Sequence, residues 1–460
     1  MPLIKSISGI RGTIGGLPGE TLSPLDVVKF TAAYGTWLLQ QSNGNNKVVI
    51  GRDGRMSGEM IQRLVISTLN SLGIDVVDVD LSTTPTVEMG VVFENAAGGI
   101  ILTASHNPKE WNALKLLNAK GEFISAEDGA TILEIAANDS YCFVSVDKLG
   151  SYTLSTDTLD KHIQAILNYP LVNVAAIKKA NFSVVVDAIN SSGAFAVPAL
   201  LKALGVNNIT VLNEEVNGKF AHNPEPLPQH LTGLCTEVKK QKAHIGIAVD
   251  PDVDRLCFVC EDGSLFGEEY TLVAVADYVL QHRKGNTVSN MSSTRALKDI
   301  TLKHGGIYTP SAVGEVNVVN KMKATNAVIG GEGNGGIIVP DLHYGRDALI
   351  GIALFLSHLA LSNKSAKQLR NSYPDYFISK NKIELEKRVD VAKVFEAIKK
   401  KYKNNPINTE DGLKIEFDND WVHLRTSNTE PIIRIYSESS FETTAENIAR
   451  RLMQDIRESM

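Results

Sequence analysis

Three stretches of this chain repeat one order of apolar and polar positions. Residues 48–79 and 183–212 each begin with an apolar run, pass through a turn of small residues and an amphipathic stretch, and end in a Leu-Gly pair and a second apolar run; residues 286–310 repeat the order more weakly. The order predicts a strand, a helix and a parallel second strand joined by a right-handed crossover. We expect a serine or threonine, such as Ser57 and Ser192, to cap each helix at its start, and a glycine to take the left-handed conformation near its end.

The chain after residue 372 has a different pattern. It predicts an amphipathic helix at 391–402, a hairpin-like pair of strands within 413–427, a strand at 432–439 and a closing helix at 446–460. Elements in this order are typical of a smaller α+β domain. We therefore predict an α/β protein with three related mixed α/β domains and a smaller C-terminal α+β domain. The predicted domains are 1–150, 151–255, 256–370 and 371–460.

The length and composition of the chain fit a soluble protein of several domains. At 460 residues the chain is too long for one hydrophobic core. Its net charge of -6 argues against a nucleic-acid partner, which would require a strong basic excess. No apolar segment near the start reads as a signal peptide, and the longest apolar run, 348–361, predicts a buried helix instead of a membrane span. We expect a cytoplasmic monomer or homodimer that binds neither nucleic acid nor membrane.

The cysteines support the same compartment. Four cysteines in the whole chain suit a reducing cytoplasm. Cys257 and Cys260 have the spacing of a redox or metal pair, but they lie in an apolar run, and the chain has no second such pair to complete a zinc site. We interpret both as core residues of a strand.

Candidate chemistry begins on the loop Thr103–Asn112, TASHNPKEWN, which follows the apolar run 98–102. Ser105 lies there among small and polar residues, at the end of a predicted strand. His106 and Lys115 are near it in the sequence. A serine that protrudes from a strand end beside such neighbours is placed to hold a phosphoryl group.

A second loop places carboxylates at alternate positions, Asp250, Asp252 and Asp254. Three carboxylates repel one another unless a cation balances them, and oxygen ligands favour Mg²⁺ or Ca²⁺ over zinc. A calcium EF-hand is an alternative, but its sixth position needs glycine where this chain has Arg255, and the flanking sequence predicts strands instead of helices. We predict a Mg²⁺ site at a strand end.

Two further loops carry weaker signals. Residues 330–336, GGEGNGG, combine glycines with Glu332 and Asn334, which can bond to sugar hydroxyls, although a flexible turn would explain the glycines almost as well. Residues 425–430, RTSNTE, offer Arg425 together with hydroxyls and amides as a phosphate cradle between two strands. Ordinary hairpin turns use the same residue types.

The sequence leaves the roles of three more charged residues open. Arg11 lies in a predicted mobile loop near the N-terminus, where it is either a surface residue or part of a site. Arg346 and Asp347 are as consistent with a structural ion pair as with a pair of site residues.

Together the four loops resemble those of the α-D-phosphohexomutase superfamily. TASHNP, DPDVDR, GEGNGG and RTSNTEP stand in the order of that family, and the resemblance covers essentially the whole chain. It implies three α/β domains and a smaller fourth domain around a central cleft. It also implies an enzyme that moves a phosphoryl group between two oxygens of a hexose or hexosamine phosphate, with Mg²⁺, a phosphoserine and a sugar-1,6-bisphosphate that is both intermediate and activator.

The resemblance also implies residue roles. Ser105 would be the phosphoserine, and one of its phosphate oxygens would complete the Mg²⁺ site formed by Asp250, Asp252 and Asp254. The reacting centre would contain Arg11, His106, Lys115 and Arg255; the sugar hydroxyls would contact Glu332 and Asn334; and the phosphate that does not react would be held by Arg425, Ser427, Asn428 and Thr429. We expect Lys115 to be the general base, provided that burial and Arg11 lower its pKa.

Differences from the family pattern bear on the substrate. Many phosphomannomutases and phosphoglucomutases resemble GEMSGH in the sugar loop, where this chain has Asn334 and Gly336 in place of Ser and His. They also carry Gly-His-Ser where this chain has Val313-Gly314-Glu315, and we expect the acidic Glu315 to attract a protonated amino sugar. The chain looks closer to phosphoglucosamine mutases, so interconversion of glucosamine 6-phosphate and glucosamine 1-phosphate is the leading hypothesis. A phosphomannomutase/phosphoglucomutase is the alternative; a serine phosphatase or a non-catalytic sugar-phosphate sensor fits these motifs less well.

Overall fold

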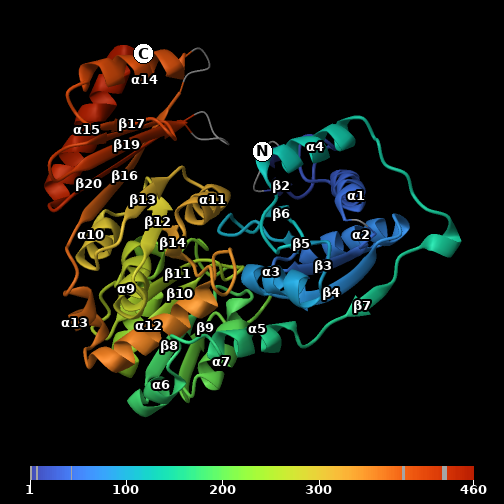
Figure 1. The fold of residues 1–460 in the computed structure, drawn as a ribbon, viewed down its shortest axis with the longest axis horizontal. Helices are drawn as coiled ribbons and strands as arrows, with labels where there is room; N and C mark the ends of the chain where they lie inside the picture. Colours follow the sequence, from blue (N-terminus) through green and yellow to red (C-terminus); the bar gives the residue numbers. More distant parts are fainter. Residues whose placement is uncertain (1–2, 7–8, 43, 386–388, 427–431) are drawn as a thin grey trace.

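The described residues form four sheets that follow one another along the chain. The computed structural model describes residues 3–6, 9–42, 44–385, 389–426 and 432–460. Figure 1 shows four units laid along an arc, from the first in blue, through green and yellow, to the last in red. The expected three α/β units and a smaller α+β unit are confirmed, while the exact domain boundaries stay predictions.

The first unit is a seven-stranded mixed sheet in the order β1-β2-β6-β5-β3-β4-β7. Alternate residues of a strand face opposite sides of a sheet. Accordingly, Val48 and Ile50 of β3 pack with α1 and α2, whereas Val49 between them packs with α3. The elements are β1 (Ile4–Ser6), β2 (Gly9–Thr13), α1 (Pro24–Gln41), β3 (Lys47–Arg52), α2 (Gly58–Ser71), β4 (Asp75–Leu81), α3 (Thr84–Phe93), β5 (Gly98–Leu102), β6 (Trp111–Leu117), α4 (Ala126–Ala137), the short helix η1 (Val146–Lys148) and β7 (Tyr152–Leu154).

The second and third units are four-stranded sheets that share one hydrophobic core. Their strand orders are β11-β10-β8-β9 and β13-β12-β14-β15. The second unit contains α5 (Thr158–Leu167), α6 (Val174–Ala180), β8 (Ser183–Asp187), α7 (Gly193–Ala203), β9 (Asn208–Leu212), η2 (Pro228–His230), α8 (Thr232–Gln241), β10 (Ile245–Val249) and β11 (Leu256–Cys260). The third contains α9 (Glu268–His282), β12 (Asn286–Asn290), α10 (Ala296–Lys303), β13 (Tyr308–Ser311), α11 (Glu315–Thr325), β14 (Ala327–Glu332), β15 (Gly336–Ile338), α12 (Ala348–Ser362) and α13 (Ala366–Arg370).

The fourth unit is a five-stranded antiparallel sheet in the order β16-β20-β19-β18-β17, with its own core. The helices and strands predicted for this region are confirmed. The elements are β16 (Phe377–Glu384), α14 (Val391–Lys401), β17 (Ile407–Asn408), β18 (Leu413–Glu416), β19 (Trp421–Thr426), β20 (Ile432–Ser439) and α15 (Glu442–Ser459).

The internal repeat expected from the sequence is confirmed. Its copies are β3-α2-β4, β8-α7-β9 and β12-α10-β13, and in each copy the two strands are parallel neighbours. Gly73, Gly205 and Gly305 follow the three helices with φ of 79°, 85° and 74°. This left-handed conformation ends a helix readily when the residue has no Cβ.

The serines expected to cap the repeated helices do not cap them. Within the described residues, Ser57 and Ser192 make no side-chain cap to α2 and α7, whereas Thr294 Oγ1 accepts from the first amide of α10 at 3.2 Å. Ser57 Oγ instead accepts a hydrogen bond from Asn112 at 2.9 Å, and Ser192 Oγ donates to the carbonyl of Ser82 at 2.6 Å. These hydroxyls join segments that are distant in the sequence, and this tertiary role replaces the local one.

Two expectations about buried segments are confirmed. The apolar run 348–361 lies in α12, whose residues from Ala348 to Leu359 are buried. Cys257 and Cys260 are fully buried on β11. Across the part of the chain that the structure describes, every helix is too short or too polar to cross a bilayer.

Candidate active site

Ser105 lies on the serine loop, residues 103–110, between β5 and β6. Ser105 is 7% exposed, and its φ of 48° lies in the left-handed region, which is strained for a residue that has a Cβ. Two hydrogen bonds hold it: the Ser105 amide donates to Thr103 Oγ1 at 2.9 Å, and Thr103 Oγ1 donates to Asp53 at 2.7 Å. In this position Ser105 Oγ donates to Asp250 Oδ2 of the second unit at 2.7 Å.

Arg55 holds the rest of the serine loop, and sequence reasoning did not identify it. Its side chain is fully buried, and Nε donates to Asp53 at 3.0 Å. The other four N–H groups of the guanidinium donate to the carbonyl groups of Ser105, Asn107, Pro108 and Trp111. All five donors of the arginine are therefore satisfied, and they fix the path of the loop. The only sequence signal was an Asp-Gly-Arg turn in the first repeat.

The acidic loop, residues 250–255, connects the antiparallel strands β10 and β11, so the expectation of flanking strands instead of EF-hand helices is confirmed. Its three carboxylates are fully buried, and their ligand atoms lie within 4.8 Å of one another. The Oδ1 atoms of Asp252 and Asp254 are buried, and the residues that the structure describes offer them no hydrogen-bond partner. Because unpartnered buried carboxylate oxygens are costly, the residues present fit a divalent cation with oxygen ligands.

Burial and mutual repulsion shift the acidity of these carboxyl groups. Burial, followed by the charges of Asp254 and Asp252, raises the pKa of Asp250 well above its usual value. Burial alone would also raise the pKa of Asp252, but Lys115 and the hydroxyl of Thr84 hold it below its usual value. The pKa of Asp250 is therefore raised and that of Asp252 lowered, as expected where like charges share one site.

Lys115 reaches the acidic loop from β6. Its Nζ lies 2.8 Å from Asp252 Oδ2 and 3.5 Å from Asp254 Oδ2. Burial alone would lower the pKa of Lys115, but these two carboxylates raise it above its usual value. The expected lowering by burial and Arg11 is therefore wrong for this arrangement. Arg11 lies on the strand β2 instead of a mobile loop, and its Nη1 donates to Asn107 Oδ1 at 3.0 Å.

Two arginines, Arg11 and Arg255, supply positive charge near Ser105. Arg255 pairs with Glu225 at 2.9 Å, and its Nε lies 4.0 Å from Asp250 Oδ2. His106 Nδ1 lies 3.4 Å from Ser105 Oγ. Burial, and the charges of Arg255 and Arg11, hold the pKa of His106 well below its usual value. Burial and Arg255 lower the pKa of Arg11 as well. Cations that oppose one another's charge in this way favour an anion bound between them.

Arg346 joins the acidic loop to the sugar loop, residues 330–336. Its guanidinium donates to Asp254 at 2.7 Å, to Glu332 at 2.8 Å and to Glu315 at 2.9 Å. Of the two interpretations left open for Arg346 and Asp347, the mutual ion pair is not found among the described residues: Asp347 caps α12 and faces two histidines. Glu315 shares Arg346 with Asp254 and Glu332, and its expected attraction for a protonated amino sugar stays a prediction.

The sugar loop contains the end of β14, the turn 333–335 and the start of β15, and hydrogen bonds hold its polar side chains. Glu332 Oε1 accepts from Asn290 at 2.8 Å and from the Gly314 amide at 3.0 Å, while Asn334 Nδ2 lies 3.4 Å from Glu332 Oε2. Burial alone would raise the pKa of Glu332, but Arg346 and these donors lower it. Gly335 has a φ of 84°, and a Cβ there would lie 2.0 Å from the Leu256 carbonyl oxygen, so the loop requires glycine where it packs against β11.

The last predicted loop is only partly described. Arg425 lies on β19 of the fourth unit, with Nε 3.3 Å from Asp411 Oδ2. The predicted residues Ser427, Asn428 and Thr429 lie outside the described residues. The contacts above bring the serine, acidic and sugar loops together, whereas Arg425 belongs to a separate unit with a partner of its own.

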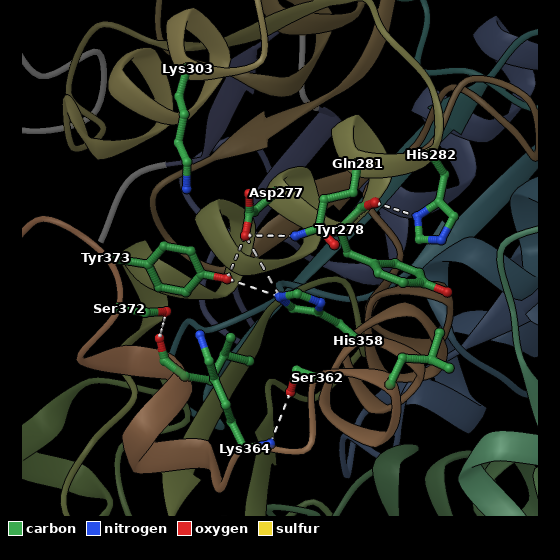
Figure 2. Close-up of a pocket in the computed structure, with 12 residues that line it drawn as sticks. Asp277, Tyr278, Gln281, His282, Lys303, His358, Ser362, Lys364, Ser372 and Tyr373 are labelled. Carbon is green, nitrogen blue, oxygen red and sulfur yellow. Dashed lines mark hydrogen bonds and ion pairs between the residues drawn. The ribbon is translucent and has the colours of Figure 1, made fainter.

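A cavity of about 400 Å³ lies elsewhere, among α9, α10, α12 and α13. Figure 2 shows Asp277, His358 and Tyr373 pointing toward one another in it. Its lining includes none of the described site residues predicted from the sequence. This cavity is therefore separate from the candidate active site.

Comparison with known proteins relates the whole chain to one family. Models of the phosphoglucomutase/phosphomannomutase α/β/α domains I, II and III match residues 4–141, 160–263 and 267–376, and a model of the C-terminal domain matches residues 382–455. A phosphoglucomutase/phosphomannomutase from Thermococcus kodakarensis is 38% identical over 94% of this chain and 95% of its own. A protein from Methanopyrus kandleri named "Probable phosphoglucosamine mutase" is 32% identical over 98% of each chain. The crystal structure of a phosphoglucomutase/phosphomannomutase family protein from Burkholderia thailandensis superposes with a TM-score of 0.83 at 25% identity, covering 99% of this chain and 97% of that one.

Proposed function

Because this chain belongs to the phosphoglucomutase/phosphomannomutase family of phosphohexomutases, we propose that it interconverts glucosamine 6-phosphate and glucosamine 1-phosphate. Ser105 is the proposed carrier of the phosphoryl group, and a sugar-1,6-bisphosphate is the proposed intermediate. One observation supports the choice of Ser105: its buried hydroxyl donates to Asp250 at 2.7 Å and so lies against the acidic loop, as a nucleophile beside a bound cation would.

Mg²⁺ is the cation proposed for the acidic loop. Asp250, Asp252 and Asp254 would hold it, and the unpartnered Oδ1 atoms of Asp252 and Asp254 support this assignment. When bound, Mg²⁺ would offset negative charge on a phosphoryl group at Ser105.

Three residues beside Ser105 are proposed to stabilise the transferring phosphoryl group. Arg11 and Arg255 supply positive charge from two different units, and an anion between them would relieve their mutual repulsion. Burial and the same cations lower the pKa of His106, so it can offer a hydrogen bond without adding charge. Donors fixed in advance in this way need no reorganisation when charge develops.

Lys115 is the proposed general base. The carboxylates of Asp252 and Asp254 hold its Nζ as a cation, and sharing them with a bound metal ion would weaken that effect and lower the pKa of Lys115. In the first transfer the sugar hydroxyl would give its proton to Nζ as its oxygen bonds to phosphorus and the bond from Ser105 Oγ to phosphorus breaks. The proton held by Nζ would then restore the hydroxyl of Ser105. The second transfer reverses these changes at the other phosphate of the bisphosphate.

The two remaining loops are proposed to bind the parts of the substrate that do not react. Glu332 and Asn334 would bond to the sugar hydroxyls. Arg425 and the residues Ser427, Asn428 and Thr429 would hold the distal phosphate. The bisphosphate must turn around between the two transfers, so each loop has to accept both orientations of the sugar.

The choice of glucosamine rests on the sugar loop and on the named relatives. GEGNGG lacks the Ser and His of the GEMSGH pattern, and a 32% identical relative is named as a probable phosphoglucosamine mutase. The 38% identical relative, however, is named phosphoglucomutase/phosphomannomutase. That name favours a second candidate with the same chemistry, a mutase of glucose or mannose phosphates.

Rates on three sugars separate the candidates. We would measure kcat/KM in parallel on the 6-phosphates of glucosamine, glucose and mannose, with Mg²⁺ and a trace of sugar bisphosphate. A clear preference for glucosamine 6-phosphate is the expected result. Equal or higher values for glucose or mannose 6-phosphate would replace the proposal by the second candidate, and steady release of inorganic phosphate without isomerisation would replace it by a serine phosphatase.

A further inference from the structure

A second cluster of ionisable side chains lies where three units meet. His162 comes from α5 of the second unit, and His343 and Asp347 come from the segment before α12 in the third. Glu88 of α3, in the first unit, lies beside His343. The side chains of His162 and Asp347 are fully buried, and those of Glu88 and His343 are 1% and 7% exposed. The phosphoryl-transfer chemistry proposed above uses none of these residues.

Asp347 Oδ2 is at the centre of the cluster. It lies 3.0 Å from His162 Nε2 and 3.2 Å from His343 Nε2, and all three residues offer a ligand atom within 4.8 Å of the others. Ligand atoms bonded to one zinc ion at about 2.0–2.2 Å in a tetrahedron are roughly 3.3 Å apart. The two separations from Asp347 Oδ2 are therefore close to those that a shared metal ion produces.

An oxygen atom lies close to the outward-facing nitrogen of each histidine, where the N–H of a metal-binding imidazole would need an acceptor. His343 Nδ1 lies 3.3 Å from Glu88 Oε2, and His162 Nδ1 lies 3.0 Å from Thr86 Oγ1. Asp347 Oδ1 accepts from the first amides of α12, the nearer at 2.8 Å, which leaves Oδ2 for another role. An imidazole that binds metal through one nitrogen commonly donates its other N–H to a carboxylate or another oxygen, as His343 and His162 can here.

The buried negative charge of the cluster also favours a bound cation. Glu88 and Asp347 are buried carboxylates, and among the described residues the oxygens of Glu88 accept no well-directed hydrogen bond, although His343 Nδ1 lies 3.3 Å from Oε2. A buried carboxylate is costly unless positive charge and N–H donors balance it. One divalent cation would offset both negative charges while the two imidazoles stay neutral, and the Nδ1–H of His343 would then serve Glu88.

We propose that His162, His343 and Asp347 bind one divalent transition-metal ion of the zinc class, which fastens the second and third units and, through Glu88, the first. Two nitrogen ligands and one oxygen ligand suit Zn²⁺ or Co²⁺ and not Mg²⁺, whereas the oxygen-only acidic loop has the reverse preference. The site would also fix the backbone next to Arg346, the residue that joins the acidic and sugar loops.

Co²⁺ is the probe that tests this site, because its visible absorption reports nitrogen ligands and low coordination number. The full chain is treated with a chelator, returned to excess Mg²⁺ to fill the acidic loop, and titrated with Co²⁺ and then with Zn²⁺. We expect about one Co²⁺ per chain with intense visible bands that Zn²⁺ abolishes. His162→Gln and His343→Gln should each weaken this binding at least about 10-fold.

A matched control is His358→Gln. His358 is another buried histidine, but its Nε2 is 3.7 Å from Asp277 Oδ2 and bonds to the Tyr373 hydroxyl at 3.1 Å (Figure 2). This variant should keep wild-type Co²⁺ binding. If the two ligand variants do not fold, the wild type decides alone: Zn²⁺ should raise its Tm in excess Mg²⁺. Absence of saturable Co²⁺ or Zn²⁺ binding in excess Mg²⁺, or equal binding by wild type and both ligand variants, would overturn the proposal.

Discussion

Replacing Arg346 with lysine should uncouple the acidic loop from the sugar loop. The guanidinium gives one N–H from each of its nitrogens to Asp254, Glu332 and Glu315, over 2.7–2.9 Å. Lysine keeps the positive charge but carries it on a single nitrogen, which cannot serve carboxylates in three directions. Glu332 would lose the partner that holds its pKa low and its side chain in place.

The size of the effect follows from the number of bonds lost. A hydrogen bond to a buried charged group contributes about 1.5–3 kcal/mol, so the loss of two costs about 3–6 kcal/mol before the loops relax. If about half of this cost reaches the bound transition state, kcat/KM falls about 10–100-fold. The remainder should lower the Tm, since Arg346 links two units.

The assay compares kcat/KM and Tm for the wild type, Arg346→Lys and a control, Arg283→Lys. Arg283 pairs with Asp341 on the surface, where the two side chains are 48% and 45% exposed. An exposed pair contributes only about 0–1 kcal/mol, so the control should resemble the wild type. A variant Arg346→Lys with wild-type kcat/KM and Tm would refute the coupling role of Arg346.

Four further predictions concern the same molecule. Ser105→Ala should remove nearly all turnover while far-UV circular dichroism stays unchanged; normal turnover would exclude Ser105 as the carrier. Arg55→Met should lower the free energy of unfolding by about 3–5 kcal/mol in denaturant titrations, because it leaves Asp53 as an unpaired buried charge, and a loss below about 1 kcal/mol would contradict its bracing role. Chelation of divalent cations should stop turnover and added Mg²⁺ should restore it, whereas full activity after chelation would argue against a metal in the acidic loop. Burial raises the pKa of Glu269 to about 8, so the folded chain keeps a proton that the unfolded chain releases near pH 4.5. The Tm should therefore fall as the pH rises from 4.5 to 8, and it should fall less in Glu269→Gln. Identical pH profiles of Tm for the wild type and the variant would contradict this.

The units of the fold could be predicted because their signals are local. The repeated strand-helix-strand order depends on apolar periodicity and on glycines such as Gly73 and Gly205, which a sequence shows directly. The serine caps of α2 and α7 were predicted by the same local reasoning and were wrong. Ser57 and Ser192 lie where segments meet, and there a tertiary hydrogen bond competes with the cap.

The loops of the candidate site could be found from their sequences, but not the arginines that hold them. Arg55 bonds to carbonyl groups about 50 residues away in the sequence, and Arg346 to carboxylates on three other segments. Backbone carbonyls are present at every position, so no residue type marks the partners of Arg55. The acidity of Lys115 could not be predicted either, because it depends on which carboxylates the fold places against Nζ.

The most direct test of the account is to locate phosphate on the chain. The purified protein is incubated with a hexose 1,6-bisphosphate and Mg²⁺, and the phosphorylated residue is identified by peptide mass spectrometry. We predict one phosphoryl group on Ser105, which disappears when excess hexose 6-phosphate is added and is absent from Ser105→Ala. Turnover without phosphate on Ser105, or phosphate on a different residue, would contradict the central claim.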